Sequence, residues 1–138
     1  MGLFDKCDDT GKLILRVMIG ALLLLHGIAK MKGGVDWMTG MLASHGLPGF
    51  IRYGVYVGEV IAPILIVVGL FSRPAGLVVA FNMLVAVLLV RRNDIFVIEP
   101  QGGGASIEIE LLYMLGGIAI WCLGSGRYAV SRGRGRWD

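Results

Sequence analysis

Four stretches of mainly apolar residues alternate with polar segments along the chain, over residues 13–30, 53–71, 74–92 and 107–124. A helix that crosses the hydrocarbon core of a bilayer needs about 20 such residues. The four stretches use most of the 138 residues, so little sequence is left for a soluble domain. The pattern therefore predicts an all-α membrane protein, in which residues 1–138 form a single domain with four transmembrane helices.

The connections between these stretches differ in length and composition. Only two residues separate the second stretch from the third, and Pro74 suits the first turn of a helix. We therefore expect an antiparallel hairpin here, within an antiparallel bundle of four helices. The third connection, residues 93–106, combines a β-favouring run with Pro100 and three consecutive glycines, and we expect it to be irregular or mobile.

The first connection carries its own helical pattern. Trp37, Met38, Met41 and Leu42 recur at helical spacing, and Asp36 precedes them as a possible helix cap. These residues predict a short helix that lies in the membrane interface. Met38, Met41 and His45 would share one face of it, but methionines at this spacing usually pack into the lipid boundary, so we assign no metal site.

Composition supports the bilayer as solvent, with 56% hydrophobic residues and a mean hydropathy of +0.75. The net charge is +3, but the basic residues are dispersed, with no basic face interleaved with aromatics, so no nucleic acid is expected as partner. Cys7 and Cys122 are expected to be free thiols. The first stretch has no small-residue cleavage site after Leu25 and is read as a retained helix rather than a signal peptide.

The distribution of basic residues predicts the orientation. With both termini in the cytoplasm, eight of the 13 Lys and Arg residues lie on the cytoplasmic side. The tail contributes Arg132, Arg134 and Arg136 to this count. In the simpler interpretation, these arginines only fix the cytoplasmic side of the chain by the positive-inside rule. Alternatively, they bind anionic lipid or a partner protein.

Several polar side chains fall inside the apolar stretches. An ionisable group at membrane depth is costly unless it is paired or hydrated, so each is a candidate functional residue. Those of the first helix share an arc of about 80° at 100° per residue, which is expected to face the bundle. The candidates are Arg16, His26 and Lys30 in the first helix, Glu59 in the second, Asn82 in the third, and Glu108 and Glu110 in the fourth.

Alternating helix directions place most of these groups at one depth. A rise of 1.5 Å per residue puts His26 and Glu59 about 6 and 9 Å below the outer boundary, with Lys30 and Glu108 close to it and Arg16 at the opposite end. Glu108 and Glu110 point about 160° apart, so only one can face the bundle. Which of the two does so stays open.

Two interpretations of this outer layer stay open. In the first, Lys30 forms a neutralising ion pair with Glu59 or Glu108 that fixes helix packing, with His26 hydrogen-bonded beside it. In the second, the layer is a polar pocket that binds a headgroup or small ligand and moves protons through His26 and Glu59. A quinone headgroup would fit this chemistry.

The order and spacing of several motifs resemble those of the DoxX family. The matching features are Arg16, the segment 26–30, Gly58 with Glu59 and Pro63, the segment 69–75, Gly103 and Gly104 ahead of Glu108, residues 111–113, and the segment 124–128. Two positions depart from the family pattern: Ser131 stands where the family usually has aspartate, and Glu110 adds a second charge after Glu108.

The resemblance implies a four-helix protein of the bacterial inner membrane. Some family members are described as subunits of quinone-linked sulfur-oxidising enzymes or of membrane oxidoreductase assemblies, and many have no assigned activity. We therefore predict a subunit of a redox assembly that is not catalytic alone, contacts lipid and either other membrane subunits or further copies of itself, and possesses no covalently bound cofactor. The alternatives are a non-catalytic accessory subunit and a small transporter, which four short helices could form only as an oligomer.

Overall fold

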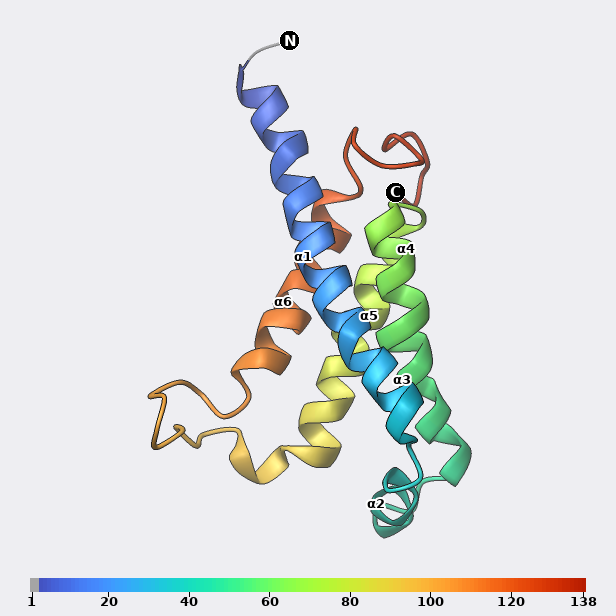
Figure 1. The fold of residues 1–138 in the computed structure, drawn as a ribbon, viewed down its shortest axis with the longest axis vertical. Helices are drawn as coiled ribbons and strands as arrows, with labels where there is room; N and C mark the ends of the chain where they lie inside the picture. Colours follow the sequence, from blue (N-terminus) through green and yellow to red (C-terminus); the bar gives the residue numbers. More distant parts are fainter. Residues whose placement is uncertain (1–2) are drawn as a thin grey trace.

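A computed structural model describes residues 3–138, and Figure 1 shows that its long elements are all helices. Within this range the only β-type pairing is an isolated antiparallel bridge between Ile98 and Ala105. The long helices are α1 (Leu3–Gly33), α5 (Ser72–Val90) and α6 (Glu108–Leu123). Between α1 and α5 lie α2 (Met38–Ser44), a 3₁₀ turn (Gly49–Tyr53), α3 (Gly54–Tyr56), a π-helical turn (Val57–Ile61) and α4 (Ala62–Val68).

Three helical segments of the described chain are long and apolar enough to cross a membrane. They are Lys6–Gly33, the composite helix Gly49–Val68, and Ser72–Val90. Helix α6 has 16 residues, or about 24 Å at 1.5 Å per residue, which is shorter than a hydrocarbon core of about 30 Å. The chain is therefore a helical membrane protein, and the fourth crossing stays a prediction.

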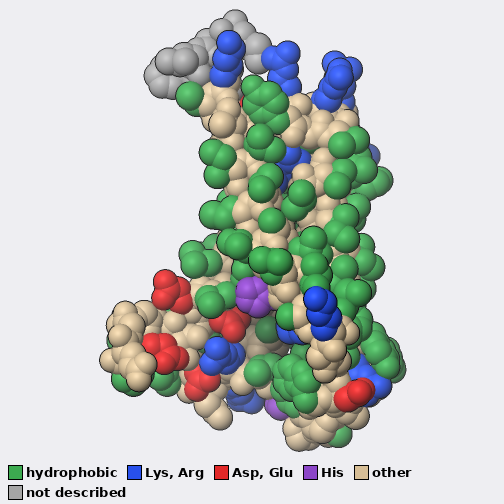
Figure 2. Space-filling model, in the orientation of Figure 1, with side chains coloured by type: hydrophobic (Ala, Val, Ile, Leu, Met, Phe, Trp, Pro, Cys, Tyr) green, Lys and Arg blue, Asp and Glu red, His purple; other side chains and the backbone are tan. Residues whose placement is uncertain are grey.

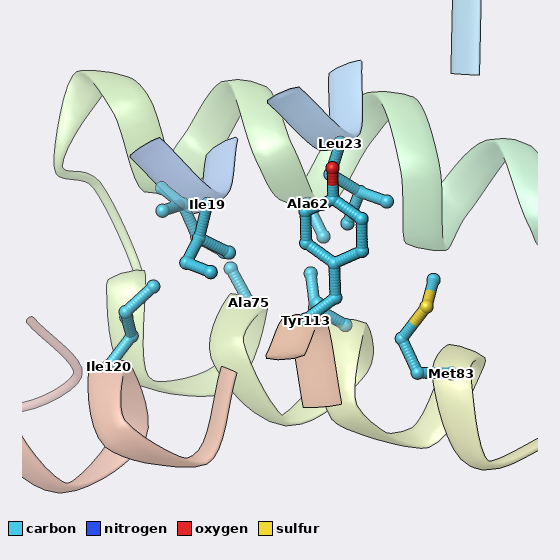
Figure 3. Close-up of a cluster of buried hydrophobic side chains, with 9 residues drawn as sticks. Ile19, Leu23, Ala62, Ala75, Met83, Tyr113 and Ile120 are labelled. Carbon is cyan, nitrogen blue, oxygen red and sulfur yellow. The ribbon is translucent and has the colours of Figure 1, made fainter. Parts of the chain in front are cut away.

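The hydrophobic core nevertheless includes α6. Ile19 and Leu23 of α1 pack with residues of α4, α5 and α6, and Ile120 of α6 is fully buried. Figure 3 shows the ring of Tyr113 standing among Leu23 and Ala62. The apolar side chains on the outer surface of all four helices, Leu112 and Leu115 of α6 among them, remain exposed in the single chain. This is the pattern of side chains that face lipid.

Helix α2 occupies the first connection, where the sequence predicts a short helix. Its N-terminal residue is preceded by Trp37, and no side chain caps it, so the expectation that Asp36 is the cap is wrong. The carboxylate of Asp36 instead lies 3.5 Å from the guanidinium of Arg52, which also donates to Thr39. Because Trp37 occupies the N-cap position, Asp36 lies one residue too early to be the cap.

The turn between α4 and α5 is tight. Gly69, with φ of 80°, ends α4, and its amide donates to the carbonyl of Leu65 at 2.9 Å. A left-handed conformation at this position is typical of a glycine that terminates a helix. Helix α5 begins at Ser72, two residues earlier than the predicted start at Pro74, and Pro74 lies in its first turn.

The third connection is less irregular than its composition suggests. A 3₁₀ turn (Arg92–Asp94) follows α5, and the amide of Glu99 donates to the carbonyl of Gly104 at 2.9 Å beside the bridge that joins Ile98 to Ala105. The glycines therefore form the bend of a short hairpin, because glycine tolerates the backbone angles that such a bend needs.

The last residues fold back over one end of the helices, where Figure 1 also shows the N-terminal end of α1. The amide of Val130 donates to the carbonyl of Val68 at 3.1 Å, and the Asp138 carboxylate accepts from the amide of Phe71 at 2.6 Å. Arg73 donates to the carbonyls of Trp121 and Cys122. The tail is therefore attached to the α4–α5 turn and to the end of α6.

Candidate functional site

Three polar side chains from three helical segments meet inside the bundle. The ammonium of Lys30, near the end of α1, lies 2.6 Å from Oε1 of Glu59 in the π-helical turn. The amide Nδ2 of Asn82, from α5, donates to the same oxygen at 3.2 Å. We call these residues, Lys30, Glu59 and Asn82, the carboxylate cluster. Of the two partners that the sequence offers Lys30, Glu59 and Glu108, the structure selects Glu59.

The π-helical turn positions the carboxylate, and Pro63 explains why it forms. A proline has no amide hydrogen and its ring clashes with the carbonyl four residues earlier, which here belongs to Glu59. Widening the helix at Val57–Ile61 relieves that clash and leaves Gly58 and Glu59 both buried, although they are adjacent in sequence. Such turns occur frequently at functional sites. The proline was a usable signal in the sequence, because it stands four residues after the glutamate.

Two glycines allow the close approach that the cluster needs. A Cβ on Gly27 of α1 would collide with the carbonyl of Glu59, and a Cβ on Gly58 would collide with the side chain of Asn82. Because glycine has no side chain, α1 and α5 can pack directly against the π-helical turn. Among the small residues of the second predicted helix, Gly58 and Ala62 are buried, whereas a Cβ on Gly54 would have no neighbour within 4 Å.

The second oxygen of Glu59 has no hydrogen-bond partner among the described residues. The glutamate side chain is only 3% exposed, whereas that of Lys30 is 29% exposed. A buried carboxylate oxygen without a donor is costly, so such groups usually have a partner or a function. The cluster thus combines an ion pair with an unused acceptor, and its cation reaches the surface.

Tyr113 and His26 lie next to the cluster. The Tyr113 side chain of α6 is 8% exposed and interacts electrostatically with Glu59. The His26 ring meets the Tyr113 ring edge-on, with 5.7 Å between centroids, and its Nδ1 lies 3.0 Å from the carbonyl of Leu22. His26 itself is exposed, so the expectation that it faces the bundle is wrong. Tyr113 is a buried core residue beside His26 that the sequence pattern did not indicate as part of the site.

The two glutamates of α6 lie outside the cluster. Glu110 is 3.4 Å from Nε of Arg91, at the far end of α5, and so it is the glutamate that faces a neighbouring helix. Glu108 is exposed and turns back toward Gly104. The alternative in which Lys30 pairs with Glu108 is therefore wrong, because Lys30 contacts Glu59 and the Glu108 side chain, at the start of α6, turns toward the hairpin. That Glu108 shares the depth of the cluster stays a prediction.

Arg16 lies apart from the carboxylate cluster, at the end of the bundle where the tail folds. Its side chain is 1% exposed and donates to the carbonyl of Tyr128 at 2.7 Å and to that of Ile66 at 3.4 Å. It also packs against Gly69 in the α4–α5 turn. Arg16 thus joins α1, α4 and the tail, which is a structural arrangement that the sequence did not indicate.

Among the described residues, no group of three or more His, Cys, Asp or Glu side chains is close enough to hold a metal ion. In the short α2 region, His45 instead makes a contact of 2.9 Å with the carbonyl of Met41. The chemistry that the carboxylate cluster can perform is recognition of a hydrogen-bonding group and exchange of a proton at the free oxygen of Glu59.

Comparisons with known proteins identify related sequences. The family model of DoxX matches residues 11–92, which include every member of the carboxylate cluster. A Bacillus subtilis (strain 168) protein named "Putative oxidoreductase CatD" is 30% identical over 108 residues, covering 78% of this chain and 76% of that protein. An uncharacterized protein of Haemophilus influenzae is 31% identical over 104 residues, 73% of each chain.

No solved structure matches the chain significantly. The family match covers more than half of the chain, and one relative with 30% identity covers more than two thirds of it. The chain therefore belongs to the DoxX family.

Proposed function

We propose that this protein is a subunit of a membrane redox assembly and that its carboxylate cluster binds the headgroup of a small redox carrier, with a quinone as the best candidate. The observation that carries the proposal is the unpartnered Oε2 of Glu59, which is buried beside the ion pair with Lys30. The oxidoreductase named among the relatives supports the redox context. In this proposal the protein lies in the bacterial inner membrane with both termini in the cytoplasm.

The cluster has the groups that a quinone headgroup requires. A quinone carbonyl accepts hydrogen bonds, which Lys30 and Asn82 can donate. Reduction to the quinol takes up two electrons and two protons, and a quinol hydroxyl can donate to Oε2 of Glu59. The electrons come from a partner protein of the assembly, while this chain orients the headgroup and exchanges a proton at Glu59.

An apolar groove beside the cluster suits the tail of such a molecule. Its volume is about 380 Å³, and its lining residues are Met31, Tyr56, Val60 and Ile61. Met31 and Val60 are the sequence neighbours of Lys30 and Glu59, and the Tyr56 hydroxyl lies 3.5 Å from the carbonyl of Lys30. The groove therefore lies close to the carboxylate cluster along the chain, although none of the three cluster residues is part of its lining.

The test is purification of the full chain in mild detergent, followed by quinone extraction and identification of co-purifying proteins. We expect Glu59→Gln, which keeps the shape of the side chain but removes its charge, to reduce bound quinone and linked electron transfer by about tenfold, the loss of one charged hydrogen bond. The matched control is Glu99→Gln, because Glu99 lies in the exposed hairpin and contacts Ser106. Bound quinone and electron transfer at wild-type levels in Glu59→Gln would contradict the proposal.

The second candidate function is that of a non-catalytic accessory subunit. The contacts of Gly27 and Gly58 favour it, because the cluster lies where helical segments pack closely against each other. In that case Glu59→Gln would reduce the amount of co-purifying partner, while electron transfer per assembled complex would stay unchanged. The same preparation therefore distinguishes the two functions.

A further inference from the structure

The tail forms a cavity with an unusual lining. Arg127, Tyr128, Arg132 and Arg134 surround a volume of about 570 Å³, which falls in the range of roughly 300–1,000 Å³ typical of small-ligand sites. Figure 2 shows Lys and Arg side chains projecting from this end of the molecule, whereas the acidic side chains visible on that face gather at the other end. The lining is therefore cationic, with one aromatic hydroxyl.

The backbone around this cavity is held in place. The carbonyl of Tyr128 accepts from the buried Arg16, and the amide of Arg127 donates to the carboxylate of Asp9 at 3.0 Å. Ser125 is 1% exposed, and its hydroxyl lies 3.2 Å from that of Ser131. A cavity whose backbone is already fixed loses less entropy when it binds a ligand.

The tail bends so that Arg127, Arg132 and Arg134 line the same space. Arg132 and Gly133 adopt left-handed conformations, with φ of 53° and 65°. Within the described part of the chain, neither Arg132 nor Arg134 forms an ion pair through its side chain. Asp138, the nearest acid along the chain, is bonded instead to the amide of Phe71. The two guanidinium groups are thus available for an anion from outside the chain.

We propose that this cavity binds a phosphate group. Guanidinium groups recognise phosphate through pairs of parallel hydrogen bonds, and a tyrosine hydroxyl can donate one more. The cavity lies at the end of the membrane-spanning helices, which is the depth of phospholipid headgroups, and anionic headgroups attract Arg-rich segments there. The shared chemistry is a phosphate, carried either by an anionic lipid or by a soluble molecule.

The experiment titrates the full chain in mild detergent with phosphatidylglycerol or phosphatidylcholine and counts bound lipid by native mass spectrometry. We expect preference for phosphatidylglycerol, and an affinity about thirtyfold lower in the variant Arg132→Gln/Arg134→Gln, since each of the two Arg residues near an anionic headgroup contributes about 1 kcal/mol. The matched control Lys32→Gln/Arg92→Gln removes the same charge near the ends of α1 and α5 that lie opposite the tail, and it should change affinity less than about twofold.

Inorganic pyrophosphate identifies the source of the phosphate. If it displaces the lipid, the cavity serves soluble phosphate compounds; if it does not, the cavity serves the lipid headgroup. Unchanged affinity in the cavity variant would overturn the proposal, because the cavity arginines would then not attract the lipid. Equal losses in both double variants would also overturn it, because the attraction would then be a general effect of positive charge. Should the double variant fail to fold, Arg134→Gln alone gives the same comparison, since the Arg134 side chain does not hold the tail.

Discussion

At the scale of single residues, the sequence left two interpretations of Glu59 open, a packing ion pair and a ligand site. The geometry around Glu59 has features of both. Its Oε1 accepts from Lys30 and Asn82, which is the arrangement of a packing ion pair. Its Oε2 is buried and has no donor among the described residues, which is what the proposed ligand site requires. The two oxygens therefore have different roles, and a carboxylate can serve both because each oxygen has two lone pairs.

Replacing Lys30 by methionine should show how strongly the pair stabilises the bundle. Loss of one partner leaves Glu59 buried and unpaired, so we expect unfolding in detergent to become easier by about 3 kcal/mol, the lower end of the range for buried pairs, because the ammonium is partly exposed. The double variant Lys30→Met/Glu59→Gln should recover part of that loss. Thermal unfolding of the four proteins in a mutant cycle provides the measurement.

Lys32→Met is the control for that cycle, because Lys32 is exposed near the end of the same helix. Additive effects of the Lys30 and Glu59 substitutions would show that the ion pair contributes nothing to stability.

At the scale of elements, the π-helical turn determines which side chains of the second predicted helix are buried. A regular helix would separate Gly58 and Glu59 by 100°, so that only one could face the α1 backbone directly. The wider turn lets Gly58 contact Asn82 while the Glu59 carbonyl lies beside Gly27. Hydrophobic periodicity alone does not reveal such a turn. Pro63 indicates it, because proline has no amide hydrogen to donate to the carbonyl of Glu59, four residues earlier, as a regular helix requires.

Two identical substitutions in α1 test this close packing. In Gly27→Ala the new methyl group would collide with the Glu59 carbonyl, and we expect a destabilisation of at least about 2 kcal/mol from overpacking. In Gly11→Ala no atom lies within 4 Å of the new Cβ, so the helix should be stabilised by up to about 1 kcal/mol. Thermal unfolding of both variants would refute the packing argument if Gly27→Ala were as stable as Gly11→Ala.

At the scale of the whole molecule, the shorter α6 decides the topology. The core residues of α6 pack with those of α1, α4 and α5, and its outer leucines are exposed in the same manner as theirs. The first three spans cross the bilayer in alternating directions. The tail can therefore lie at the same end as the N-terminal part of α1 only if α6 also crosses the bilayer. A length of 16 residues is compatible with local thinning of the bilayer.

Cysteine labelling can determine whether α6 crosses. In a Cys122→Ser background, Cys7 is the remaining native thiol, and it is exposed. We expect an impermeant maleimide to label Cys7 and an introduced Arg134→Cys from the same side of the membrane. A third probe, Gln101→Cys in the exposed hairpin, should react from the opposite side. Labelling of Arg134→Cys and Gln101→Cys from one side would mean that α6 does not cross.

The sequence by itself determined the helical membrane class, because apolar stretches of this length have few alternatives in water or lipid. It also determined that Lys30 and Glu59 reach a similar depth, since the rise per residue is constant and successive helices run in opposite directions. The family resemblance was confirmed independently by the match to residues 11–92. These properties follow from local geometry along the chain.

Only the tertiary structure decided which groups touch. The choice of Glu59 over Glu108, the exposed position of His26, the burial of Tyr113 and the return of the tail to Arg16 depend on how the helices rotate and splay. Those rotations are set by contacts between residues far apart in sequence, such as Gly27 with Glu59. A periodic pattern specifies which face of a helix is apolar, but it does not specify which neighbouring helix that face meets.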